Sequence, residues 1–386
     1  WSPEIAEILR HLCLYPELPN LDVWKELLKE PVPEEDWEKV RVAVRKTLDH
    51  QSQESTDCRW IKVMCYVVGG KLQLESKEAV EAILRYPNQG DQQVVRPTIR
   101  ATEIALQISD PTEWSKHFWD YSYLSTDCVP DDVSERKVKA RKEEWLSEDK
   151  NRDHFKEQTT KVRCALTDHF FAQHGTMINA RREVSFGLAL YGLTLFTEII
   201  FYRSSKSISG RIALRSLVEN YINFKYLLEK EKTETKIWDD FHLYGNGKIK
   251  LIYMKLKENN VRMNSVNMDD LRFIANEDAW TEFVPINLGH WDSTDMRKMS
   301  DAAGVKDIYD KFYDYTSGFV HGNRGAVRES IYQVCFNELH RLHRIPAFDM
   351  PLMASVTLDS VEIVNKLLDC LDVAYPPFEA RIELPS

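Results

Sequence analysis

Glycine and proline are scarce in this chain, which has only 14 glycines and 15 prolines among 386 residues. All-β folds are rich in turns and need more of both. Leucine, glutamate, lysine and alanine, which favour helices, are plentiful instead. The sequence therefore predicts an all-α fold, and a hydrophobic fraction of 43% is enough for a buried core.

An overall positive charge is also lacking. The formal net charge is −10, which excludes a chain that attracts nucleic acid through its total charge. One dense basic cluster, RKVKARK at 136–142, stands in a highly charged run from 130 to 162. We interpret this run as an exposed helix or a helical linker, with a nucleic-acid contact of the basic cluster as the alternative.

Paired cysteines and a long apolar segment are missing as well. The seven cysteines form no CxxC pair and no secretory signal is visible, which predicts free thiols and a cytoplasmic setting. The most apolar run, 186–202, contains Glu198 and is shorter than the roughly 20 residues of a membrane span. We predict a buried helix there, with Arg203, Arg211 or Arg215 as a partner for the Glu198 carboxylate.

The common catalytic and metal-binding templates are absent too. The sequence has no phosphate loop, no GxGxxG turn, no HExxH and no GxSxG. His340 and His343 are three positions apart and would suit a metal, but we interpret them as a surface pair. The sequence thus predicts no metal site and no cofactor.

The apolar periodicity divides the chain into two predicted parts. Residues 1–150 form a helical N-terminal domain that binds a partner or regulates, and residues 151–386 form a helical bundle with an insertion at about 259–304. The run 60–74 reads as a helix or as two strands, with the helix favoured. Further helices are predicted at 77–87, 96–109, 163–180, 207–232, 236–258, 326–342 and 358–374.

Two predicted helices of the bundle carry polar stripes. In 306–324, residues Asp310, Asp314, Ser317 and His321 recur at spacings of three and four, and Gly322 with Asn323 ends the helix.

In 207–232, Arg215, Glu219 and Asn223 recur every four residues on a helix otherwise suited to burial. The stripe is either a polar seam inside the bundle or a helix-surface ion pair.

The segments RSLVENYINFKY at 215–226 and YTSGFVHG at 315–322 resemble a bacterial family of unknown function. That family looks like a distant branch of the HEPN superfamily. HEPN domains are helical bundles, often dimeric, and many are metal-independent ribonucleases of toxin and phage-defence systems. The resemblance covers roughly residues 155–375 and implies a HEPN-like bundle.

The resemblance implies a catalytic site made of Arg215, Glu219, Ser317 and His321. Metal-free RNA cleavage needs an acid–base group, which His321 suits, and a cation for the phosphate, which Arg215 or Arg324 would supply. Glu219 would orient His321. The implied substrate-binding residues are Arg324, Asn323, Asn223 and Tyr315.

One departure from the HEPN pattern concerns its usual motif, in which four to six residues separate an arginine from a following histidine. His321 has no such arginine, whereas Arg163 and His169 fit the spacing, as a few pairs would by chance. Two functions therefore remain. The first is an RNase-type effector of antiviral defence or a toxin system, a homodimer with RNA as substrate. The second is a non-catalytic interaction module with a structural Arg–Glu–His seam and a protein partner for its N-terminal part.

Overall fold

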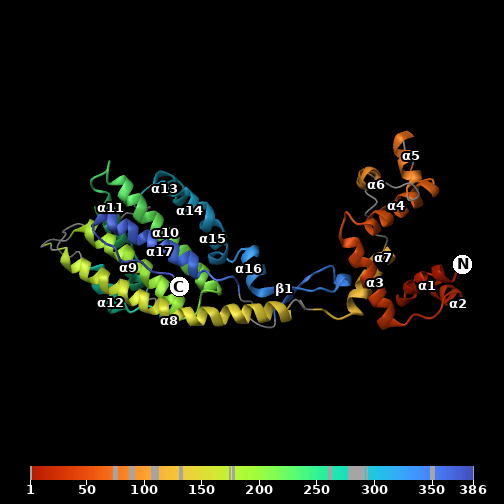
Figure 1. The fold of residues 1–386 in the computed structure, drawn as a ribbon, viewed down its shortest axis with the longest axis horizontal. Helices are drawn as coiled ribbons and strands as arrows, with labels where there is room; N and C mark the ends of the chain where they lie inside the picture. Colours follow the sequence, from red (N-terminus) through yellow and green to blue (C-terminus); the bar gives the residue numbers. More distant parts are fainter. Residues whose placement is uncertain are drawn as a thin grey trace. The chain divides into compact units, whose positions relative to one another are not determined.

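The computed structural model describes residues 2–72, 77–86, 92–105, 113–129, 134–173, 175, 179–259, 263–276, 292, 294–347 and 353–385, apart from some side chains, chiefly those of 134–150. It is 73% helical with one small two-stranded sheet, so the predicted all-α fold is confirmed (Figure 1).

The chain forms two compact units. The first unit comprises Trp1–Val133 and Gln333–Pro346, and the second comprises Ser134–Tyr332 and Ala347–Ser386. The predicted division at residue 150 lies inside α8 (Ser134–Ala172), a continuous helix, so the two units divide where α8 begins. Residues 333–346 were predicted within the bundle but belong to the first unit.

The first unit consists of short helices over two small hydrophobic cores. One core joins Tyr15, Trp37 and Phe118, with the rings of Tyr15 and Phe118 packed edge to face at 6.1 Å. The other joins Val63 and Tyr86 with their neighbours. The elements are α1 (Pro3–Leu9), η1 (Arg10–Leu14), α2 (Leu21–Leu27), α3 (Pro33–Leu48), α4 (Gln53–Val68), α5 (Lys77–Arg85), α6 (Gln92–Ala105) and α7 (Glu113–Leu124).

Two sequence predictions in this unit are decided by the structure. The ambiguous run 60–74 is helical up to Val68, where α4 ends before Gly69. The helix predicted at 326–342 is wrong beyond Ile331, because the chain continues as β1 (Tyr332–Val334), a 3₁₀ turn η3 (Glu338–His340) and β2 (Arg344–Pro346). The side chain of Asn337 accepts a hydrogen bond from the Leu339 amide and caps the start of η3. This separate turn takes the place of the second half of the predicted helix.

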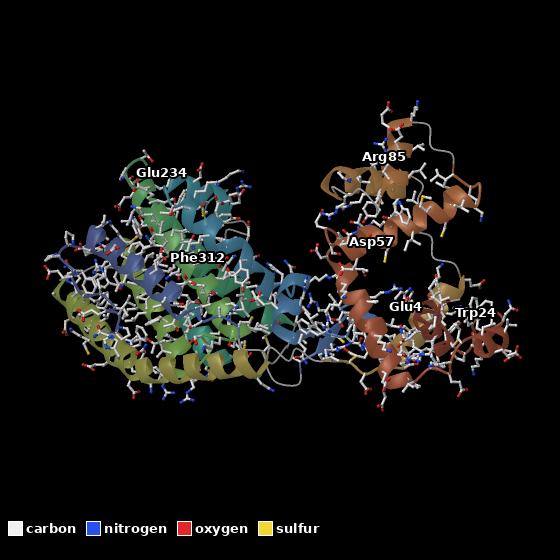
Figure 2. The ribbon with its side chains drawn as sticks, turned by 45° about the vertical axis from the view of Figure 1, so that its right-hand side comes forward. Glu4, Trp24, Asp57, Arg85, Glu234 and Phe312 are labelled. Atoms are coloured by element: carbon white, nitrogen blue, oxygen red, sulfur yellow. The ribbon has the colours of Figure 1, made fainter. Side chains whose placement is uncertain are left out.

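The second unit is a helical bundle whose central helices α9, α10 and α17 pack against one another (Figure 1). Its core contains Leu193, Leu217 and Leu367, all buried. Phe312, labelled in Figure 2, belongs to the same core. The elements are α8, α9 (Ala180–Phe201), α10 (Ile208–Lys230), α11 (Ile237–Glu258), α12 (Met268–Ala275), α13 (Met296–Ala302), α14 (Lys306–Ile308), a π-helical turn η2 (Tyr309–Tyr313), α15 (Asp314–Val320), α16 (Arg324–Ile331) and α17 (Thr357–Ala374). Within the predicted insertion 259–304, the described elements are α12 and α13.

Helix α9 is long and apolar enough to cross a membrane by length and composition. In the fold it packs against α8, α10, α11 and α17, which accounts for its composition as that of a core helix. Glu198 lies on its exposed side, so the prediction that this carboxylate needs a buried arginine partner is wrong.

Candidate functional site

Arg215 and Glu219 of α10 meet Tyr313 of η2 and form what we call the Arg215 cluster. The guanidinium lies 2.9 Å from a Glu219 carboxylate oxygen and donates a 2.7 Å hydrogen bond to the Tyr313 hydroxyl. Its central carbon lies 4.0 Å from the centroid of the Tyr313 ring. The cluster therefore links two elements of the second unit through one cation.

The Arg215 cluster is partly buried. The side chain of Arg215 is 11% exposed, whereas that of Glu219 is 34% exposed. Burial raises the pKa of the Tyr313 phenol, so this hydroxyl stays protonated and neutral at physiological pH. The interaction that the Arg215 cluster provides is a charge-assisted hydrogen bond from a guanidinium to a neutral phenol.

Tyr313 is brought to Arg215 by a π-helical turn. Residues 309–313 form this turn, and the rings of Tyr309 and Tyr313 stack within it at 4.4 Å. A π turn accommodates one extra residue and rotates the side chains that precede it relative to those that follow. The α-helical spacing assumed for 306–324 therefore holds only from Asp314 onward.

Ser317 and His321 do not join the Arg215 cluster. In the described part of the chain, neither side chain makes a hydrogen bond, ion pair or ring contact with Arg215 or Glu219. His321 is exposed at the C-terminal cap of α15, where its backbone amide donates to the Ser317 carbonyl at 3.2 Å. Eight residues beyond Tyr313, it lies about 12 Å further along the helix axis. The helix end at Gly322 is confirmed, since Gly322 has a φ of 61°.

The implied substrate-binding residues divide in the same way. Asn323 and Arg324 are exposed at the start of α16, and the side chain of Asn323 makes no capping hydrogen bond. Tyr315 is half exposed and its hydroxyl donates to Glu329 at 2.7 Å, which ties α15 to α16. Asn223 is half buried on α10. The exposed residues gather at the junction of α15 and α16.

The pair with HEPN-like spacing, Arg163 and His169, is structural in this fold. Nε2 of His169 hydrogen-bonds the Tyr375 carbonyl at 2.7 Å, and its ring packs on Phe378 at 5.3 Å. Arg163 donates to the Thr194 hydroxyl instead. The two side chains serve separate helix contacts.

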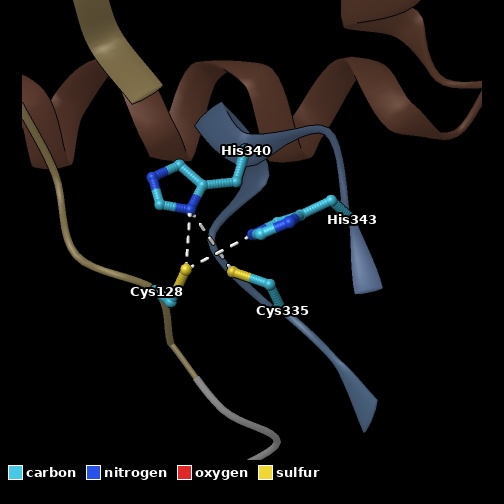
Figure 3. Close-up of side chains that lie close together, drawn as sticks. All are labelled: Cys128, Cys335, His340 and His343. Carbon is cyan, nitrogen blue, oxygen red and sulfur yellow. Dashed lines mark hydrogen bonds between the residues drawn. The ribbon is translucent and has the colours of Figure 1, made fainter. Parts of the chain in front are cut away.

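A second group of chemically capable side chains lies in the first unit, where Cys128, Cys335, His340 and His343 face one another (Figure 3). The ligand atoms of all four lie within 4.8 Å of one another. We call them the Cys–His cluster. Cys335 and His340 are buried, His343 is half buried and Cys128 is exposed.

The electrostatics of this cluster favour uncharged donors. Burial lowers the pKa of His340, which keeps its imidazole neutral. Burial, with the adjoining Cys335, raises the pKa of the Cys128 thiol. The cluster brings two cysteine sulfurs and two imidazoles together, and these are the donor atoms that a soft or borderline metal ion binds.

The four residues of this cluster are not recognisable as a group in the sequence. Cys335 and His340 fall on the predicted helix 326–342 and His343 just beyond it, and their spacing is not one of the zinc motifs. The interpretation of His340 and His343 as a surface pair is wrong for His340, which is buried. Cys128 precedes His340 by 212 positions. The sequence signal for this cluster was the density of cysteine and histidine shortly after Ile331. It was not recognised because the strands of that segment were predicted as helix.

Comparison with known protein families gives a match over part of the chain. Residues 182–333 match the model of a family of unknown function, DUF5677. This segment runs from α9 through α16, so it contains the Arg215 cluster and His321, whereas all four residues of the Cys–His cluster lie outside it. No curated protein and no solved structure matches the chain.

Proposed function

We propose that this chain works by binding, as a helical interaction protein in which Arg215, Glu219, Ser317 and His321, all among the described residues of the second unit, do not assemble into a catalytic centre. The observation that carries the proposal is the state of Arg215. Its side chain is 11% exposed and its guanidinium is engaged by Glu219 and Tyr313, whereas His321 is exposed and contacts neither. The Arg215 cluster is then a structural link between α10 and η2.

The chemistry of RNA cleavage supports this choice. An acid–base histidine and a phosphate-holding cation must face the same phosphodiester. Arg215 is bound at the Tyr313 end of the helix, about 12 Å along the axis from His321. This separation argues against Arg215 and His321 acting together on one phosphate within a single chain. Arg324, the other cation considered for the phosphate, is exposed close to His321.

The first unit offers a surface for a protein partner. An open groove of about 690 Å³ runs along α6 and is lined by Arg96, Pro97, Arg100 and Ile104 among others. Ile104 is 72% exposed. Apolar side chains flanked by arginine suit an extended segment that carries apolar and acidic residues.

One experiment tests the absence of a catalytic centre. The purified full chain, His321→Ala and Arg215→Ala are incubated with a fluorogenic RNA in the presence of EDTA, and each is melted in parallel. We expect no cleavage by any of the three, a lower melting temperature for Arg215→Ala and an unchanged one for His321→Ala. Cleavage by the wild type that His321→Ala abolishes without loss of stability would overturn the proposal.

A second experiment tests the partner surface. A photo-crosslinking residue is placed at Ile104 in cells, with Val68, which is also exposed, as the matched position outside the groove. We expect a discrete crosslinked protein at Ile104 that disappears when Arg100→Glu is added. A crosslink that is equal at both positions, or insensitive to Arg100→Glu, contradicts the groove as the binding surface.

A second candidate function rests on the exposed junction of α15 and α16. His321, Asn323 and Arg324 are all exposed there, so a second copy of the chain would have access to them. The resemblance to HEPN ribonucleases then implies a cytoplasmic homodimeric RNase of antiviral defence or a toxin system, with a composite site. This candidate predicts that expression of the chain is toxic. It also predicts that His321→Ala and Arg324→Ala are each inactive alone, and that mixing the two variants restores RNA cleavage.

A further inference from the structure

We propose that Cys128, Cys335, His340 and His343 form a structural zinc site in the first unit (Figure 3). Two thiolates and two imidazoles are a donor set typical of structural Zn²⁺. Hard cations such as Mg²⁺ and Ca²⁺ prefer oxygen ligands. All four coordination positions are filled by the protein, which leaves no open position for a substrate and indicates a structural role.

The spacing of the donor atoms already fits this geometry. A tetrahedral zinc ion with Zn–S bonds of about 2.3 Å and Zn–N bonds of about 2.05 Å places each sulfur about 3.6 Å from each nitrogen. In the structure Sγ of Cys128 lies 3.5 Å from Nδ1 of His340 and 3.3 Å from Nε2 of His343. Sγ of Cys335 lies 3.5 Å from the same His340 nitrogen.

The far side of the His340 ring is bound in the way that metal-ligating histidines require. Its Nε2 lies 3.1 Å from the Thr126 carbonyl and donates to it. This hydrogen bond places the ring proton on Nε2, so the lone pair of Nδ1 faces the two sulfurs. The ring of Tyr123 packs on His340 with a centroid distance of 4.3 Å and holds its orientation.

Backbone hydrogen bonds fix the ligands in register. The Cys335 amide donates to the His343 carbonyl at 2.9 Å and sets these two ligands opposite each other. The Phe336 amide donates to the Val129 carbonyl at 2.7 Å, which holds the segment that carries Cys128 against the same loop. The site is therefore preorganised by groups that are not ligands.

The turn between the two histidines provides an independent indication. Arg341 and Leu342 both have positive φ angles, 53° and 51°. Side chains other than glycine, asparagine and aspartate rarely adopt this left-handed conformation, and two in succession persist only where the surroundings enforce them. The turn brings His340 and His343 to one side of the loop, and a bound metal would hold it there.

A disulfide between Cys128 and Cys335 is the competing use of the two sulfurs. A disulfide would not account for the two imidazoles, because the S–S bond forms without any contribution from His340 or His343. A metal uses all four groups, and it closes a loop of more than 200 residues between Cys128 and the 333–346 segment.

The test measures bound metal in the full chain purified without chelators. We compare the wild type with Cys335→Ser and His343→Ala, and we use Cys58→Ser and His117→Ala as matched controls, because both are exposed residues of the first unit outside the cluster. We expect one zinc per chain in the wild type and controls and a loss of most of it in both ligand variants. Equal zinc in all five proteins would overturn the proposal.

A second measurement uses only the wild type, in case a ligand variant fails to fold. Zinc is removed by a chelator and replaced by Co²⁺. We expect the intense visible absorption of tetrahedral Co²⁺ and a thiolate-to-metal charge-transfer band in the near ultraviolet. The site would be refuted if the purified chain contains no zinc and shows neither absorption band after Co²⁺ is added. It would also be refuted if peptide mapping of protein prepared anaerobically finds a Cys128–Cys335 disulfide.

Discussion

Replacing Arg215 with alanine should destabilise the second unit by about 3 kcal/mol, because Arg215 makes three separable interactions. The partly exposed pair with Glu219, four residues apart on α10, contributes about 0.5 kcal/mol. The 2.7 Å hydrogen bond to Tyr313 comes from a charged donor and contributes about 1.5–2 kcal/mol. The guanidinium at 4.0 Å from the Tyr313 ring adds about 0.5–1 kcal/mol.

Two matched variants divide this sum. Tyr313→Phe removes the hydroxyl and keeps the ring, so it should cost about 1.5–2 kcal/mol. Glu219→Gln removes only the ion pair and should cost about 0.5 kcal/mol. In the double variant Arg215→Ala/Tyr313→Phe the losses should be less than additive, since the two residues share one hydrogen bond.

The assay is urea unfolding of the full chain followed by circular dichroism, with the free energy taken from the transition of the second unit. The predicted order of destabilisation is Arg215→Ala, then Tyr313→Phe, then Glu219→Gln. If Glu219→Gln costs as much as Arg215→Ala while Tyr313→Phe costs nothing, the link to η2 is not the role of Arg215. If Arg215→Ala leaves stability unchanged and removes RNA cleavage, Arg215 is catalytic.

Three shorter predictions concern the bundle. Gly192→Ala should cost about 1–3 kcal/mol in urea unfolding, since its Cβ would lie 2.4 Å from a leucine methyl of α17, whereas Gly187→Ala in open space on the same helix should add about 0.5–1 kcal/mol. The hydrogen bond from Arg181 lowers the pKa of Glu231 below 4.5. In urea unfolding, Glu231→Gln should therefore lower the free energy of unfolding by its full amount above about pH 4.5, and this loss should disappear below the lowered pKa. Burial raises the pKa of the Cys370 thiol to about 12, so mass spectrometry should find it unalkylated by iodoacetamide until the second unit unfolds.

Long helices with a regular apolar stripe could be predicted from the sequence. The 207–232 and 358–374 periodicities correspond to α10 and α17, whose buried faces pack in the core. The segment after Ile331 could not, because its strands have three residues each and the loop between them is hydrogen-bonded to residues 126–129, which are distant in sequence. Such short strands carry no periodic signal of their own.

The candidate site was predictable in part for the same reason. The spacing of Arg215 and Glu219 on one helix indicated an ion pair as one of two alternatives, and the structure contains that pair. The spacing of Ser317 and His321 also predicted a shared helix face. It could not show that a π turn places Tyr313 against Arg215, because the extra residue in such a turn leaves no mark in a single sequence.

The four proposed zinc ligands lie outside residues 182–333, the segment that matches the family model. Removal of the metal should therefore affect the first unit and leave the bundle unchanged. Chelation of the purified chain should release the loop 333–346 and the segment 126–129, since zinc would hold each to the other. Hydrogen exchange measured by mass spectrometry should therefore rise in those two segments. Exchange in α9, α10 and α17 should stay unchanged, as their core contains no ligand of the site. Faster exchange in α10 after chelation would mean that the metal stabilises the bundle as well, and unchanged exchange in 333–346 would mean that the backbone hydrogen bonds hold the loop without it.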